Sequence, residues 1–170
     1  KLFTKSLKLG VTANTVNKVW EGLIFQLKVM KSKSIEEHEH HLLNKEVIAT
    51  VKLDGIRMIV IKNDDKIMGL SRSGKIMTGY DHILANYATM PNGMYDGELL
   101  YIHRRGMKAV DVRQKTASLA NTKDGSRLDL EHVLFDFVGE RDFILKENGM
   151  PYEARRTMLE YLTQNQKYLS

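Results

Sequence analysis

The sequence predicts an α+β fold, in which a largely antiparallel sheet is flanked by helices. Several short runs rich in β-branched residues are separated by turn signals, a pattern typical of such sheets. Short helical segments are interspersed among these runs, and no internal repeat or low-complexity segment interrupts them. The 170 residues are an ordinary length for one domain and are enough to bury a core.

The N-terminal part is expected to differ from the rest of the chain. Residues 1–30 are predicted to link to the main body and pack against it, and residues 31–170 to form the main domain. Residues 31–45 are polar and carry a cluster of three histidines: His38, His40 and His41. Their spacing does not place three imidazoles on one helical face, which argues against a metal site. A solvated helix of mixed charge is expected there.

The main domain is predicted to contain a series of strands and short helices. Strands are expected at residues 46–53, 56–62, 67–71, 94–102 and 132–138. Helices are expected at residues 81–88 and 110–119 and from Pro151 onward. Proline suits the first turn of a helix, where its missing N–H costs nothing. Turns or loops are expected at residues 71–75, 91–93 and 121–127.

Composition limits the functional classes without choosing one. The absence of cysteine excludes disulfides, zinc–thiolate sites and thiol catalysis. A net charge of +5 and a pI near 9.3 are compatible with polyanionic partners but indicate them only weakly. No run approaches the roughly 18 apolar residues of a membrane span, and no secretory signal is evident. We expect a cytosolic protein, and the lack of an initiator Met suggests a fragment.

The stretch with the clearest chemical signal is K-L-D-G-I-R, which begins at Lys52. A lysine amine is a good nucleophile only when neutral, which requires desolvation or nearby cations. The apolar residues before Lys52 predict a strand whose end could desolvate the amine. A strand-end lysine whose ammonium reaches solvent is the alternative interpretation of this residue alone.

Four motifs in order resemble those of the covalent nucleotidyltransferases, which are the polynucleotide ligases and the mRNA-capping guanylyltransferases. They are K-L-D-G-I-R (52–57), S-R-S-G (71–74), Y-D-G-E-L (95–99) and L-F-D-F-V (134–138). The resemblance covers about residues 46–160. The earlier T-A-N-T-V-N-K-V also resembles a segment of phage ATP-dependent DNA ligases. The resemblance implies an ATP-grasp-like nucleotidyltransferase domain.

The resemblance also implies a role for each matching residue. Lys52 would attack the α-phosphate of ATP and carry AMP. The nucleotide-binding residues would be Thr50 near the adenine edge, Arg57 and Arg72 at the ribose and phosphate, Glu98 at a ribose hydroxyl, and Phe135 stacked on adenine. Taken singly, these residues could instead be surface charges, an ion-pair partner and a core ring. Asp54, Asp96 and Asp136 are expected to fix turns or neighbouring side chains.

The sequence departs from the family pattern downstream. An E-G-x-x-x-K/R motif and a K-x-K motif are not found before Ser170, and there is no room for a C-terminal OB-fold domain. We therefore expect a truncated adenylation domain that self-adenylylates weakly or not at all, since phosphoryl transfer depends on electrostatic stabilisation. No metal ligands are assigned within the chain.

The expected function is that of an ATP-dependent DNA ligase that seals 5′-phosphate/3′-hydroxyl nicks. The expected cofactors are ATP and Mg²⁺, the expected partner is nicked duplex DNA, and a cytoplasmic monomer without membrane contact is expected. The cytoplasm would be that of the host if the protein is phage-encoded. Two alternatives stay open: an RNA ligase or GTP-using capping enzyme, and a non-catalytic basic module that binds nucleic acid.

Overall fold

The computed structural model describes residues 13–21, 23, 33–122, 126–145 and 149–170. The chain divides into two compact units, Lys1–Ser32 and Lys33–Ser170. In the first unit, helix α1 spans Ala13–Val19. The predicted packing segment of residues 20–30 lies mostly outside the described residues, so its role stays a prediction.

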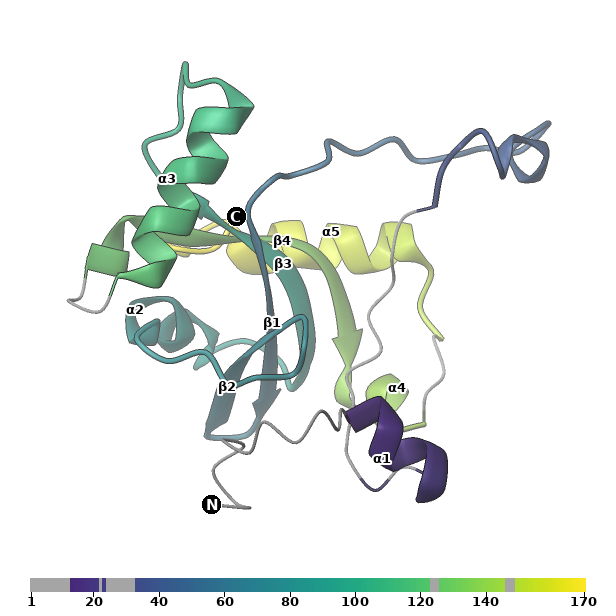
Figure 1. The fold of residues 1–170 in the computed structure, drawn as a ribbon, viewed down its shortest axis with the longest axis horizontal. Helices are drawn as coiled ribbons and strands as arrows, with labels where there is room; N and C mark the ends of the chain where they lie inside the picture. Colours follow the sequence, from purple (N-terminus) through teal and green to yellow (C-terminus); the bar gives the residue numbers. More distant parts are fainter. Residues whose placement is uncertain (1–12, 22, 24–32, 123–125, 146–148) are drawn as a thin grey trace. The chain divides into compact units, whose positions relative to one another are not determined.

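The second unit is built on a four-stranded sheet with strand order β2-β1-β3-β4 (Figure 1). Its strands are β1 (Ile56–Asn63), β2 (Lys66–Ser71), β3 (Gly93–Tyr101) and β4 (Leu130–Gly139). All three strand pairs are antiparallel. The predicted fold class is therefore confirmed, and four of the five predicted strands are found within two residues of their expected ends.

The strand predicted at residues 46–53 is wrong. Residues 46–54 have no regular secondary structure, and the segment leaves β1 as an extended chain away from the sheet (Figure 1). A strand needs a partner for its backbone groups. Both sides of β1 are taken, by β2 and β3, and residues 168–170 run along the far side of β4 through hydrogen bonds to His132 and Leu134.

Helices connect and cover the strands. They are α2 (Asp81–Leu84) with η3 (Ala85–Tyr87), α3 (Ala109–Asn121), η4 (Ser126–Asp129), α4 (Glu140–Leu145) and α5 (Tyr152–Thr163). The three predicted helices are confirmed, whereas α4 was not predicted. The histidine cluster forms only the exposed turn η2 (Glu39–His41) instead of a longer solvated helix. Among the described residues, no helix has the length and apolar character needed to cross a membrane.

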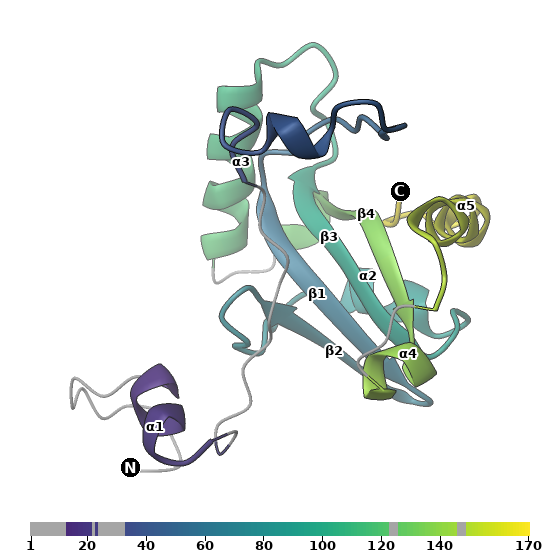
Figure 2. The ribbon, with the colours of Figure 1, turned by 90° about the vertical axis from the view of Figure 1, so that its right-hand side faces the viewer.

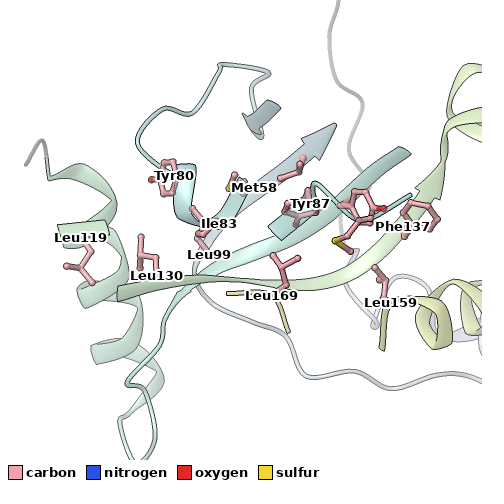
Figure 3. Close-up of a cluster of buried hydrophobic side chains, with 13 residues drawn as sticks. Met58, Tyr80, Ile83, Tyr87, Leu99, Leu119, Leu130, Phe137, Leu159 and Leu169 are labelled. Atoms are coloured by element: carbon pink, nitrogen blue, oxygen red, sulfur yellow. The ribbon is translucent and has the colours of Figure 1, made fainter. Parts of the chain in front are cut away.

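The core lies on one face of the sheet. Side chains of alternate strand positions, such as Met58 on β1 and Leu99 on β3, meet residues of the helices there (Figure 3). Tyr87 of η3 donates a hydrogen bond from its hydroxyl to His132 Nδ1 (2.6 Å), since His132 Nε2 lies 3.0 Å from the carbonyl oxygen of Met58 and must donate. This buried network ties β1, β4 and η3 together.

Helices α3 and α5 pack against β3 and β4 of the sheet. Helix α3 packs beside the end of β3, where the Tyr101 N–H donates to Thr116 Oγ1 at 3.0 Å. Helix α5 packs beside β4 (Figure 2). Arg155 of α5 binds Asp136, with Nε 2.7 Å from Oδ1. The expectation that Asp136 fixes a neighbouring side chain is confirmed. The opposite face of the sheet carries three of the residues that the sequence motifs singled out, Arg57, Glu98 and Phe135.

Candidate functional site

The arginine of K-L-D-G-I-R is held by the first acid of the D-G-E-L motif. Arg57 on β1 donates from Nε to Asp96 Oδ1 at 2.9 Å and from Nη2 to Asp96 Oδ2. The side chains are only 19% and 12% exposed, so little water competes with this paired geometry. The hydrogen bond to Asp96 raises the pKa of Arg57, against the opposing effect of burial. The expectation that Asp96 fixes a neighbouring side chain is confirmed.

An irregularity in the sheet brings Phe135 to this pair. The register of β3 and β4 shifts between Asp96 and Gly97, so that Asp96 pairs with Asp136 and Gly97 with Leu134. Phe135 is therefore the extra residue of a β-bulge, a feature that redirects side chains. The guanidinium of Arg57 lies 5.5 Å from the centre of the Phe135 ring, within cation–π range.

Glu98 lies opposite Arg57 in the register of β1 and β3. Its Oε1 accepts a hydrogen bond from the Gly55 N–H at 3.2 Å, which fastens the D-G turn to β3. A Cβ on Gly55 would lie 2.1 Å from the carbonyl oxygen of Leu99, so only glycine allows this approach. Burial raises the pKa of Glu98, while the Gly55 N–H and the positive charges of Arg57 and Lys52 oppose that rise.

Lys52 itself is exposed and lies three residues before the Gly55–Glu98 contact. Its charge acts on the Glu98 carboxylate, which places the two residues in one electrostatic environment. The apolar strand expected to surround Lys52 is absent, because residues 46–54 are not part of the sheet. Asp54, two residues after Lys52, pairs with Arg113 of α3, and its Oδ1 lies 3.5 Å from Nη1 of the arginine. Helix α3 therefore borders the lysine segment.

The other two predicted nucleotide-binding residues, Arg72 and Thr50, are exposed and lie outside the strands. Arg72 is exposed in the turn after β2, and Ser71 before it is the register partner of Met58, next to Arg57. Hydrogen bonds from the Gly74 N–H to the Ser71 carbonyl (2.8 Å) and from the Ser71 N–H to the Lys75 carbonyl (2.8 Å) shape this turn. Thr50 is exposed on the extended segment outside the sheet.

The geometry thus joins three of the predicted nucleotide-binding residues directly. Arg57, Glu98 and Phe135 come from β1, β3 and β4 to one face, and the charge of Lys52 reaches the same place. A guanidinium, a half-buried carboxylate and an aromatic ring provide donors, an acceptor and a stacking surface, a combination suited to a nucleoside. Sequence reasoning missed the direct pairing of Arg57 with Asp96. The strand register makes Asp96 a diagonal neighbour of Arg57, and no local sequence pattern specifies that register.

Metal binding by the protein alone has little support in the described residues. Across that part of the chain, no group of three or more histidine or acidic side chains is arranged to hold a metal ion. Asp96 and Asp136 are register partners on β3 and β4, but each is occupied by an arginine, Arg57 and Arg155 respectively.

Comparisons with known proteins agree with this geometry. A structure named "Pmar-Lig_Pre." matches with a TM-score of 0.67 and 22% identity, over 95% of this chain and 39% of that one. A second, "Pmar-Lig_PreS3", has a TM-score of 0.55 and 23% identity, over 71% of this chain and 28% of that one. The ligase domain of LigD from M. tuberculosis has a TM-score of 0.50 and 22% identity, over 70% of this chain and 38% of that one.

At these identities the structural matches show the fold alone, and the chain spans well under half of each of these structures. A comparison with curated proteins gives no match. The family comparison is more specific, since residues 26–169 match the ATP dependent DNA ligase domain over most of the chain. This protein therefore belongs to the ATP-dependent DNA ligase domain family.

Proposed function

We propose that the chain carries the nucleotide-binding core of an ATP-dependent DNA ligase and that Lys52 is its nucleophile. The observation that carries the proposal is the convergence of Arg57, Glu98 and Phe135 on one sheet face, within reach of the charge of Lys52. The Lys52 amine forms a P–N bond to the α-phosphate of ATP, and pyrophosphate leaves. AMP then passes to the 5′-phosphate of a DNA nick, and the 3′-hydroxyl displaces AMP as the strand is sealed.

Each side chain of the site is proposed to bind a different part of the nucleotide. The ring of Phe135 offers a stacking surface for adenine, and the carboxylate of Glu98 accepts from a ribose hydroxyl. Arg57, oriented by Asp96, places its guanidinium charge beside the ring, at the proposed ribose and phosphate end of the nucleotide. Arg72 and Thr50 complete the set as proposed contacts of the phosphate end and of the adenine edge.

Magnesium fits this site as a companion of the triphosphate. Mg²⁺ is commonly held by one or two carboxylates together with substrate phosphates, and it keeps several waters. The described residues offer no three-ligand cluster of their own, in line with such an arrangement. Among them, Glu98 is a half-buried carboxylate on which the charge of Lys52 acts. When bound, the ion would shield the charge of the triphosphate.

The decisive test is intact-protein mass spectrometry after incubation with ATP and Mg²⁺. We expect at least a fraction of the wild-type protein to gain the mass of AMP, and Lys52→Ala to gain none while keeping its thermal melt. Lys45→Ala is the matched control, because Lys45 is an exposed lysine directly before the same extended segment. An adduct that persists in Lys52→Ala, or a wild-type adduct that peptide mapping places on another residue, contradicts the nucleophile.

Two further incubations decide between the proposed function and its alternatives. An adduct formed from GTP and not from ATP would identify a capping-type enzyme instead. Adenylylated protein mixed with a nicked duplex should lose its AMP to the DNA only when the nick carries a 5′-phosphate. Transfer to a nicked RNA strand in place of DNA would favour an RNA ligase. A monomeric, cytoplasmic protein that binds no membrane stays a prediction.

A further inference from the structure

Within the second unit, Lys33–Ser170, one short stretch carries an excess of positive charge. Residues 103–115 hold five lysines and arginines against one acid, whereas the other 125 residues of the unit hold 15 basic and 19 acidic side chains. This stretch is therefore positive in a unit whose remaining residues have a net negative charge. Residues 103–115 form the connection from β3 to α3 and the first two turns of α3, and we call them the basic segment.

Two cations of the basic segment fix it to the rest of the domain. Arg104 pairs with Glu131 of β4, and its Nη1 also donates to the Tyr101 carbonyl at 3.2 Å. Arg113 pairs with Asp54 at 3.5 Å. Gly106 adopts a φ of +78° in the turn, a conformation suited to glycine. The segment is thus anchored at both ends to neighbouring elements.

The other three cations of the basic segment do not fix it to the domain through ion pairs. Arg105, Lys108 and Lys115 are exposed, and within the described residues none of them takes part in an ion pair with a carboxylate. The ammonium of Lys115 lies 5.7 Å from the centre of the Tyr101 ring, a contact that orients it without neutralising it. These three side chains, with no acidic partner, are available for an anion outside the protein.

The basic segment also lies beside the proposed reaction centre. Arg113 contacts Asp54, two residues after Lys52, so the first turns of α3 border the lysine segment. Lys108 is the N-cap of α3, and from there to Lys115 the helix rises about 10.5 Å. Phosphates of one DNA strand follow each other every ~3.4 Å along the axis, so this distance spans about three of them.

We infer that the basic segment is a docking surface for the phosphate backbone of duplex DNA next to the nick, with Arg105, Lys108 and Lys115 as its phosphate contacts. The inference rests on the proposed function and adds the place where the substrate lies. Phosphate contacts position a nucleic acid without reading its sequence, as a nick-sealing enzyme requires. The Arg104–Glu131 pair ties the surface to β4, and the exposed Arg113–Asp54 contact places it beside the lysine segment.

The test measures DNA affinity at several salt concentrations. Each neutralised phosphate contributes about −0.9 to the slope of log K against log salt. Removing three contacts in Arg105→Ala/Lys108→Ala/Lys115→Ala should make the slope shallower by about 2.7. A fourfold rise in salt should then weaken wild-type binding about 40-fold more than it weakens binding by the triple variant. Fluorescence anisotropy with a labelled nicked duplex reports both quantities.

A matched variant separates this surface from general charge. Lys33→Ala/Lys66→Ala/Arg141→Ala removes the same three charges from exposed positions elsewhere in the second unit and should keep the wild-type slope. Equal losses in both triple variants would overturn the inference, as would wild-type affinity in the basic-segment variant. Loss of binding to anionic phospholipid vesicles with DNA binding intact would assign the surface to a membrane and also overturn it.

The inference and the proposed function fail in different experiments. Self-adenylylation needs no DNA, so the basic-segment variant should gain the AMP adduct at the wild-type rate. An adduct with an unchanged salt slope refutes the docking surface alone. A reduced slope in a protein whose adduct lies on a residue other than Lys52 supports the docking surface and refutes the ligase nucleophile.

Discussion

Asp96→Asn tests whether the carboxylate of Asp96 holds Arg57 in the site. The wild-type pair has two hydrogen bonds, one of them with Nε 2.9 Å from Oδ1, and the side chains are 19% and 12% exposed. The amide keeps the size of the carboxylate but removes its charge. It also replaces one acceptor with an NH₂ group that faces another donor on the guanidinium. One bond is therefore lost, and the charge of Arg57 loses the carboxylate that holds it in two hydrogen bonds.

The size of the effect follows from these losses. A hydrogen bond to a charged group contributes about 1.5–3 kcal/mol, and the loss of the paired charge at a mostly buried position adds a further penalty. We expect the free energy of unfolding to fall by about 3 kcal/mol. For a domain of this size, the corresponding decrease in Tm is about 6–12 °C.

Thermal unfolding followed by circular dichroism measures this decrease. The control is Glu160→Gln, which breaks an exposed Arg156–Glu160 pair of 3.1 Å whose side chains are 47% and 65% exposed. Exposed pairs contribute little, so the control should melt with the wild type. If Asp96→Asn melted together with this control, the carboxylate would not hold Arg57, and the position of Arg57 beside Phe135 would need another cause.

Two further predictions concern the sheet beneath the site. Gly97→Ala would place a Cβ 2.4 Å from a carbonyl oxygen of β4, so the strands must shift at a cost of about 1–3 kcal/mol. The Tm of this variant should lie below that of Gly139→Ala, where the Cβ meets open space. Equal Tm values for the two variants would contradict this prediction. Burial lowers the pKa of His132 from 6.5 to about 4, so the unfolded chain binds a proton between these values that the folded chain does not. The free energy of unfolding should therefore be highest above pH ~6.5 and fall by about 3 kcal/mol as the pH drops to ~4. Denaturant titrations with His103→Gln as an exposed control measure this, and a flat profile in wild type would refute it.

The strands were predictable because each has a partner that matches its pattern. The β-branched run of β1 is followed by a turn and by β2, and Asp64 in that turn takes a positive φ of 50°. Residues 46–53 carry a similar run, yet the neighbouring places in the sheet are already filled. Local propensity shows that a strand can form, whereas the strand order decides whether it does.

The sequence predicted which residues belong to the site better than it predicted the contacts between them. The motif order identified Arg57, Glu98 and Phe135, which the structure brings together. The exposed position of Lys52 and the pairing of Arg57 with Asp96 depend on how distant segments meet, which no local pattern specifies. Helix α4 was missed for a related reason, since six residues give too short a period to recognise.

The two phenylalanines of L-F-D-F-V show what the bulge does for the site. In a regular strand, Phe135 and Phe137 would point to the same face, because side chains alternate with a period of two. The register shift lets Phe137 face the core, where its ring centre lies 4.7 Å from that of Tyr95, while Phe135 contacts Arg57 on the opposite face. One motif therefore supplies both a core ring and the proposed base-stacking ring. Because the extra residue separates these two tasks, the nucleotide face can keep an aromatic ring without removing one from the core.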